Sequence, residues 1–87
     1  MEGQCYICGK WGELERHHVF GAANRKKADK MGLVLNLCHR CHNEPPGGVH
    51  FNQELDKQLK AQFQEVTMEV RGWNMERWLA EFGKNYL

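Results

Sequence analysis

Long apolar runs are missing from this sequence, and so are the signatures of several enzyme classes. No stretch comes near the ~18 consecutive apolar residues that a membrane-spanning helix needs. The first residues, Met1–Gln4, have neither the basic start nor the apolar core of a secretory signal, so we expect a cytoplasmic protein with reduced thiols. A Gly-rich phosphate loop and a Ser/His/Asp arrangement are also missing, so the hydrolases built on those motifs find no support.

Length and composition describe a small globular domain. The chain has 87 residues, of which 41% are hydrophobic and 26% charged, and no repeat or change of composition separates two domains. We therefore expect residues 1–87 to form a single domain. A chain this short buries only roughly 60 to 65% of the surface that its unfolded form exposes. Its apolar core is marginal, and a structural metal would add the missing stability.

Four cysteines form two pairs with the same short spacing, Cys5-x2-Cys8 and Cys38-x2-Cys41. Each pair lets both sulfurs reach one ion at ~2.3 Å, and two pairs complete a tetrahedron around Zn²⁺. Under reducing conditions this pattern favours a metal over disulfides. The sequence therefore predicts a structural zinc site with four cysteine ligands, which should not itself catalyse because all four positions are filled. Free core cysteines and an iron centre are the alternatives.

Residues 5–50 favour a small, zinc-stabilised α+β fold. Their apolar and β-branched residues predict strands over about Leu14–Phe20 and Leu33–Leu37. Between them, Gly21–Lys27 should form a loop, because a glycine is followed by a polar and basic run, and the strands should then pair as a hairpin. Pro45–Gly48 forbids regular structure locally and should loop out.

Residues 51–87 predict helices that support this hairpin. An apolar stripe at helical spacing runs from residue 51 to residue 70, and its helix should end at Gly72. A second helix should begin at Asn74 as N-cap, braced by Trp73 and Trp78, and end at Gly83. The first stripe consists of Phe51, Leu55, Leu59, Phe63, Val66 and Val70, and the inner face of the second helix of Met75, Trp78, Leu79 and Phe82. We expect the aromatic residues of this half to pack in the core, namely Phe51, Trp73, Trp78 and Phe82.

Five histidines stand at positions 17, 18, 39, 42 and 50. For His39 we expect a solvated or hydrogen-bonded ring. The other four histidines lie close to the cysteine pairs in the sequence. Because they cluster in this way, we do not expect all four to be merely solvated or hydrogen-bonded. Adjacent residues of a strand point to opposite faces, so His17 and His18 can serve one site only if the strand bends or the site straddles it.

A His-His-hydrophobic run at a strand end, a Leu-Cys-x2-Cys-His run and a further histidine before a helix together resemble the HNH endonucleases. These runs are His17–Val19, Leu37–His42 and Gly48–His50. The resemblance covers about residues 5–50, and residues 51–87 only loosely. It implies a ββα-metal core, made of a hairpin and a helix and often braced by a zinc ion on four cysteines.

The resemblance also implies a role for each histidine. His17 would be a ligand of a catalytic divalent cation, and His18 the general base that activates water. His42 and His50 would complete the ligand set, and His50 is the better supported because seven residues with two prolines separate the two. Cellular availability favours Mg²⁺ or Mn²⁺, and an all-histidine site would also take Ni²⁺ or Co²⁺ in vitro.

One position departs from the family pattern. The middle asparagine of the family usually stands five residues before the second cysteine pair, where this chain has Leu33. Asn36, two residues before that pair, and Asn24, in the basic segment, are the candidates to fill the role. Either could brace the active-site loop through hydrogen bonds from its side chain to the backbone.

The runs His17–Lys26 and Gly48–His50 resemble more closely still one phage group, the recombination-enhancement nucleases that act with RecA. This resemblance implies a phage-encoded, metal-dependent DNA endonuclease that nicks or cuts both strands and leaves 5′-phosphate and 3′-hydroxyl ends. Recombination, replication or packaging of DNA would be its setting. Its partners would be DNA and a recombinase or another DNA-processing protein.

The net charge of +1 says little about nucleic acid, but the placement of the basic residues says more. Most basic residues of the first half gather in one segment and, with one beside the second cysteine pair, are candidates to hold a phosphate backbone: Arg25, Lys26, Lys27, Lys30 and Arg40. A merely solvated basic loop is the alternative. Two interpretations without catalysis also stay open, namely a zinc-ribbon nucleic-acid binder and a zinc-braced phage regulatory protein, although neither needs the histidine cluster.

Overall fold

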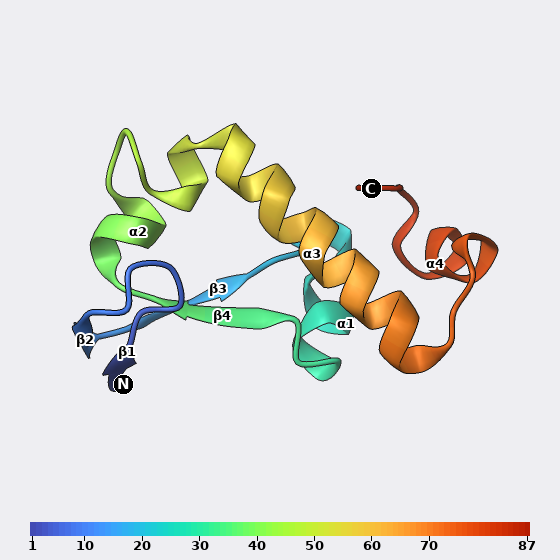
Figure 1. Ribbon diagram of the computed structural model, residues 1–87, viewed down its shortest axis with the longest axis horizontal. Coiled ribbons are helices and arrows are strands. Elements are labelled where there is room, and N and C mark those ends of the chain that lie inside the picture. Colours follow the sequence, from blue (N-terminus) through green and yellow to red (C-terminus); the bar gives the residue numbers. More distant parts are fainter.

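A two-stranded antiparallel hairpin lies at the centre of the computed structural model, which describes all 87 residues (Figure 1). Its strands are β3 (Glu15–His18) and β4 (Val34–Leu37). The register pairs His17 with Leu35 and His18 with Val34. The hairpin expected from the sequence is therefore confirmed, with both strands slightly shorter than predicted.

A second, smaller hairpin at the amino terminus was not expected from the sequence. It pairs β1 (Glu2–Gln4) with β2 (Trp11–Glu13), and the first cysteine pair lies in the turn between them. Both strands have only three residues, lie mostly exposed and contain a central glycine. No apolar alternation marks such strands, so their pairing depends on the turn that the cysteines form.

The segment that connects β3 to β4 is helical in its second half. A 3-10 turn, η1 (Ala22–Asn24), leads directly into α1 (Arg25–Lys30). The predicted loop is therefore wrong from residue 25 onwards. Arginine, lysine and alanine are good helix formers, and Ala28, which is fully buried, gives this short helix a packing face.

Four further helical elements follow: α2 (His39–Asn43), η2 (Val49–Phe51), α3 (Gln53–Arg71) and α4 (Met75–Phe82). The predicted ends of the two long helices are confirmed, because Gly72 and Gly83 both adopt left-handed backbone conformations that stop them. Asn74 caps α4 as expected, since its side chain accepts the Arg77 amide at 2.8 Å. None of the helices is both long and apolar enough to span a membrane.

The inner face of α3 differs from the predicted apolar stripe. Asn52 caps α3, because its side chain accepts the Leu55 amide at 3.1 Å. Phe51 therefore precedes the helix, and the Phe51 side chain is exposed. Val66 and Val70 also point outward. Two polar residues, Gln64 and Thr67, are buried in their place. In α4, Trp78 and Phe82 are buried as predicted, whereas Leu79 is largely exposed.

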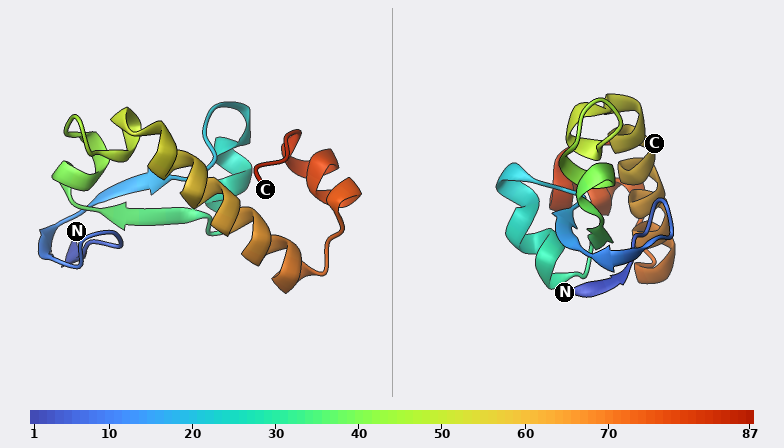
Figure 2. Two further views of the ribbon diagram at one scale, coloured as in Figure 1. Left: turned by 45° about the horizontal axis from the view of Figure 1, so that its top comes forward. Right: turned by 90° about the vertical axis from the view of Figure 1, so that its left-hand side faces the viewer.

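The core lies where α4 and the C-terminal segment meet the end of the central hairpin. Phe20 contacts Trp78, Phe82 and Tyr86, with ring centroids 5.1 to 5.5 Å apart. Buried Gln64 holds the same segment, since its Oε1 accepts the Tyr86 amide at 2.6 Å. Figure 2 shows α3 beside the hairpin with α4 at its far end. The core thus anchors the chain immediately after the two adjacent histidines.

The turn before η2 tests how tightly the fold positions His50. An added Cβ at Gly48 would lie 2.7 Å from the backbone nitrogen and 2.8 Å from the backbone oxygen of Glu44, whereas one at Gly47 would meet nothing within 4 Å. We expect Gly48→Ala to lower the free energy of unfolding by about 1 to 3 kcal/mol, as overpacking does. Thermal unfolding followed by circular dichroism would measure this, with Gly47→Ala as control. Equal melting temperatures would contradict the prediction.

Candidate metal sites and active site

The four cysteine thiols converge as the sequence predicts. One pair comes from the turn between β1 and β2 and the other from the start of α2, and all four sulfurs lie within 4.8 Å of one another. Sγ of Cys8 is 3.8 Å from Sγ of Cys38. Bonds of about 2.3 Å in a tetrahedron place sulfurs about 3.8 Å apart, so the cluster fits Zn²⁺. No disulfide forms.

The electrostatics of the cluster also suit a cation. Burial alone would raise the pKa of Cys5, but hydrogen bonds from backbone amides, first those of Cys8 and Cys38, lower it to about 6. Burial and then hydrogen bonds among the thiols raise the pKa of Cys41 to about 12. The two shifts oppose each other because the cluster favours one thiolate and disfavours further negative charge. A dication at its centre would stabilise all four thiolates and release their protons.

Three histidines form a second cluster. His17 comes from β3, His42 from α2 and His50 from η2, and one ring nitrogen of each lies within 4.8 Å of the others. The Nε2 atoms of His42 and His50 are 3.0 Å apart. Two metal–nitrogen bonds of about 2.1 Å at right angles span about 3.0 Å, so the spacing fits a shared cation.

The surroundings of His17 support the same interpretation. Its side chain is buried, and its Nε2 has no hydrogen-bond partner, which is rare for a buried polar atom. Burial and then the neighbouring His42 and His50 lower the pKa of His17 to about 4. The ring is therefore neutral at neutral pH and has a lone pair available for a metal ion.

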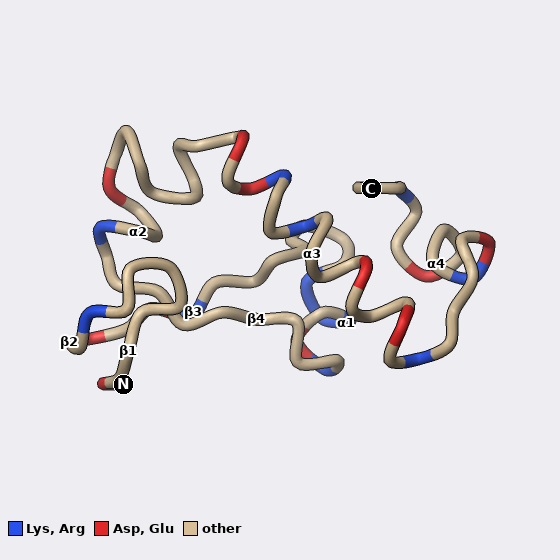
Figure 3. The backbone as a smooth tube through the Cα atoms, in the orientation of Figure 1, with Lys and Arg blue, Asp and Glu red and all other residues tan.

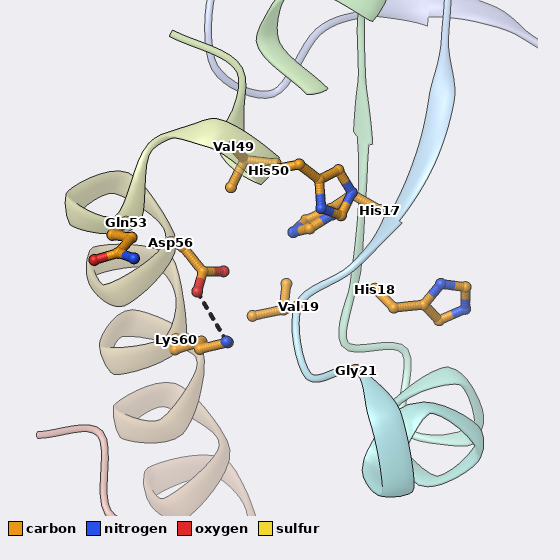
Figure 4. A pocket seen from close by; sticks show the side chains of 9 residues that line it. All are labelled: His17, His18, Val19, Gly21, Val49, His50, Gln53, Asp56 and Lys60. Atoms are coloured by element: carbon orange, nitrogen blue, oxygen red, sulfur yellow. Dashed lines mark hydrogen bonds and ion pairs between the residues drawn. The ribbon is translucent and has the colours of Figure 1, made fainter. Parts of the chain in front are cut away.

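His18 leaves the strand on the opposite side from His17, as strand alternation requires (Figure 4). Its Nε2 lies 3.5 Å from Asp29 Oδ1 in α1, and the same oxygen lies 3.1 Å from Nη2 of Arg16. The ring therefore faces α1, and His17 faces His50. A site that uses both rings would therefore have to straddle the strand.

Two adjoining polar hollows connect the two sides of the strand. Both are lined by His17, His18, Gly21 and His50. One hollow extends past Arg16 and Arg25, and the other extends along α3 past Gln53, Asp56 and Lys60 (Figure 4). A ligand in this space would reach His18 and the three-histidine cluster together.

Three charged residues around the histidines were not identified from the sequence. Glu15 binds His39 and His42, while Arg16 and Asp29 form an ion pair next to His18. Side chains alternate along a strand, which places Glu15 on the face of His17 and Arg16 on the face of His18. The sequence could therefore have predicted that both residues lie near the histidines. Asp29 had no such signal, because its position depends on how α1 packs. His39 is exposed and hydrogen-bonded, as expected.

Of the two candidate asparagines, only Asn24 makes the expected hydrogen bond from its side chain to the backbone. Asn36 is exposed and its side chain makes no hydrogen bond, although its carbonyl accepts the Tyr6 amide at 3.0 Å and so ties the first cysteine pair to β4. Asn24 does bind backbone, because its Nδ2 donates to the Phe82 carbonyl at 3.0 Å. The bracing role proposed for Asn36 is therefore wrong, and Asn24 braces the segment after β3 against α4.

The basic residues of α1 gather beside the central hairpin (Figure 3). Arg25 and Lys26 line a polar hollow together with Arg16 and His18. Lys27 does not belong to this surface, because its Nζ donates to the Glu81 carbonyl and lies over the Phe82 ring. Lys30 is exposed. Arg40 lines a separate hollow with Glu44–Gly47.

Comparison with protein-family models, with curated proteins and with solved structures finds no match for this chain.

The cysteine cluster predicts one tightly bound zinc ion per chain that survives dialysis. Cys41→Ser should lose this ion and the cooperative thermal unfolding with it, because structural zinc contributes on the order of 10 kcal/mol to folding. Native mass spectrometry and circular dichroism would measure both effects. His42→Ala, a change at the neighbouring position, should keep the zinc. A Cys41→Ser protein with bound zinc and unchanged melting would refute the site.

Proposed function

We propose that this protein is a metal-dependent DNA endonuclease of the HNH type, in which β3, β4 and α2 form the ββα-metal core. One observation carries the proposal. His17 and His50, two of the three histidines with a common focus, line the same two hollows as a fourth histidine, His18, and the third, His42, lines one of them. A purely structural cluster would not need a further histidine facing that space, with arginines beside it.

The three-histidine cluster is the proposed cation site. His17 is neutral and lacks another partner for Nε2, and His42 and His50 have the spacing of ligands on one ion. A bound divalent cation would neutralise charge on the phosphate oxygens and assist the departing oxygen. Mg²⁺ or Mn²⁺ is the expected cellular ion, and Ni²⁺ or Co²⁺ should also bind an all-nitrogen site.

His18 is the proposed general base. A water oxygen attacks phosphorus in line, its proton passes to His18, and the bond between phosphorus and the 3′ oxygen breaks. The departing oxygen takes a proton from solvent, so the products carry a 5′-phosphate and a 3′-hydroxyl. Asp29, 3.5 Å from the ring nitrogen, would stabilise the positive charge that His18 gains.

Cations beside His18 provide the proposed contact with DNA. Arg16, Arg25 and Lys26 line the hollow next to this ring, and Lys30 extends the charge along α1. Such contacts hold the phosphate backbone and carry no sequence information. A phage setting, in DNA recombination, replication or packaging and with a recombinase or another DNA-processing protein as partner, completes the proposal.

Cleavage of supercoiled plasmid tests the proposed chemistry. Wild-type protein should nick or cut only when Mg²⁺ or Mn²⁺ is present, and EDTA should abolish the reaction. His18→Ala should slow cleavage by ~10²-fold or more, because it removes the general base but no metal ligand. Labelling of the ends should show 5′-phosphate.

His39→Ala is the matched control for this experiment, because His39 is exposed and lies outside both hollows. It should cut as the wild type does. His17→Ala should lose activity that excess Mn²⁺ partly restores. Wild-type protein that binds DNA but does not cut any DNA form with any of these metals would instead favour a zinc-ribbon binder.

Binding of a DNA duplex at several salt concentrations tests the basic surface separately. Arg25→Ala should weaken binding and lower the slope of log affinity against log salt by about 1, as the loss of one phosphate contact does. Arg71→Ala, at the C-terminal end of α3 and outside the hollow beside His18, should leave the slope unchanged. Fluorescence anisotropy in the presence of EDTA measures binding without cleavage. Equal slopes for the two variants would exclude Arg25 from the interface.

A further inference from the structure

Glu15, the first residue of β3, binds three side chains of one helix. Its Oε1 lies 2.9 Å from Nδ1 of His42 and accepts from Nδ2 of Asn43 at 3.0 Å. Its Oε2 lies 2.9 Å from Nδ1 of His39. All three partners belong to α2, so a single carboxylate fastens this helix to the strand. No other carboxylate of the chain contacts the three-histidine cluster by hydrogen bonds.

The proton between Glu15 and His42 has only one consistent position. An ionised carboxylate accepts hydrogen bonds and donates none, so Nδ1 of His42 must carry the hydrogen. Asn43 Nδ2 and the ring nitrogens of His39 and His42 surround this carboxylate, so it acts as the common acceptor of these hydrogen bonds. Asn43 Nδ2, which is also 3.1 Å from Nδ1 of His42, then donates to Glu15 alone. The tautomer of His42 that carries its hydrogen on Nδ1 has its lone pair on Nε2.

That lone pair points into the cluster. Nε2 of His42 is the atom that lies 3.0 Å from Nε2 of His50. A ring with the hydrogen on Nε2 would instead present a donor where a metal ligand is needed. The carboxylate therefore selects the form of His42 that can bind a cation, and its negative charge makes the ring a stronger ligand.

Glu15 and His17 occupy the same face of the same strand, two residues apart. Glu15 pairs with Leu37 and His17 with Leu35 on β4, and the extended backbone of β3 fixes the distance between Glu15 and His17. One strand thus supplies a ligand of the cluster directly and orients a second ligand through the carboxylate.

We infer that Glu15 is a positioning residue for the three-histidine centre. Glu15 holds His42 in the form with hydrogen on Nδ1 and so directs the Nε2 atom of His42 at a divalent cation. The inference rests on the proposed function, because it deepens the role of the same site. It also links the two clusters. Cys38 is the N-cap of the helix that Glu15 holds, and Cys41 lies within that helix, so the cysteine cluster and the carboxylate fix α2 from two directions.

Metal binding tests this role without DNA. Ni²⁺ titrated by calorimetry into protein that retains its zinc should bind one further site in the wild type. Glu15→Ala should weaken this binding 10- to 100-fold, the usual effect of losing such a partner. Glu15→Gln, which keeps the shape and one acceptor but loses the charge, should fall between the two. The control is Glu13→Gln, because Glu13 is exposed and pairs only with the amino terminus.

The state of the His42 ring gives a second readout, which a merely structural role would not change. In metal-free wild type at neutral pH, nitrogen-detected NMR of labelled histidines should show hydrogen on Nδ1 of His42. Glu15→Ala should shift the ring towards hydrogen on Nε2, with zinc content and melting temperature recorded to confirm folding.

The outcomes separate the two proposals. Hydrogen on Nε2 of His42 in the wild type, or unchanged Ni²⁺ affinity in folded Glu15→Ala protein, would overturn the role of Glu15 and leave the nuclease proposal standing. A wild type that binds zinc but no second ion would overturn the cation centre, and the role of Glu15 with it. Weaker binding in Glu15→Ala together with the shifted ring would establish the inference.

Discussion

The convergence of four thiols is the constraint on which the rest of this structure depends. It joins a turn near the amino terminus to the start of α2 and encloses the 29 residues between the two cysteine pairs. The central hairpin and α1 lie within this closed segment, and α2 leaves directly from it. A chain of 87 residues cannot bury enough apolar surface to hold three separate histidine-bearing elements in place by packing alone. A metal cross-link near one end and an aromatic core near the other can do so together.

Local signals predicted those parts of the structure that local chemistry determines. The cysteine spacing located the thiol cluster, the glycines at positions 72 and 83 marked the helix ends, and the capping residue Asn74 marked a helix start. The hairpin followed from apolar runs separated by a glycine. The histidine positions led to the correct neighbours, since His17, His42 and His50 do lie together. Their roles as metal ligands stay a prediction.

The remaining features depend on contacts between distant parts of the chain, which no local pattern records. Val66 fits a helical stripe as well as Leu59 does, yet it points outward because the buried side of α3 is completed by Gln64 binding the C-terminal segment. Lys27 was grouped with a basic surface from sequence, but α4 covers it. Glu15 binds side chains of α2 only because the fold brings α2 beside β3.

The partnerless nitrogen of His17 has a consequence for how the folded protein responds to its surroundings. A buried polar atom without a hydrogen bond makes the native state less stable than an apolar side chain of similar size would. A cation that binds this atom in the folded chain, and not in the unfolded chain, shifts the folding equilibrium by mass action. The lifetime of such a protein against cellular proteases would then follow the free concentration of the ion.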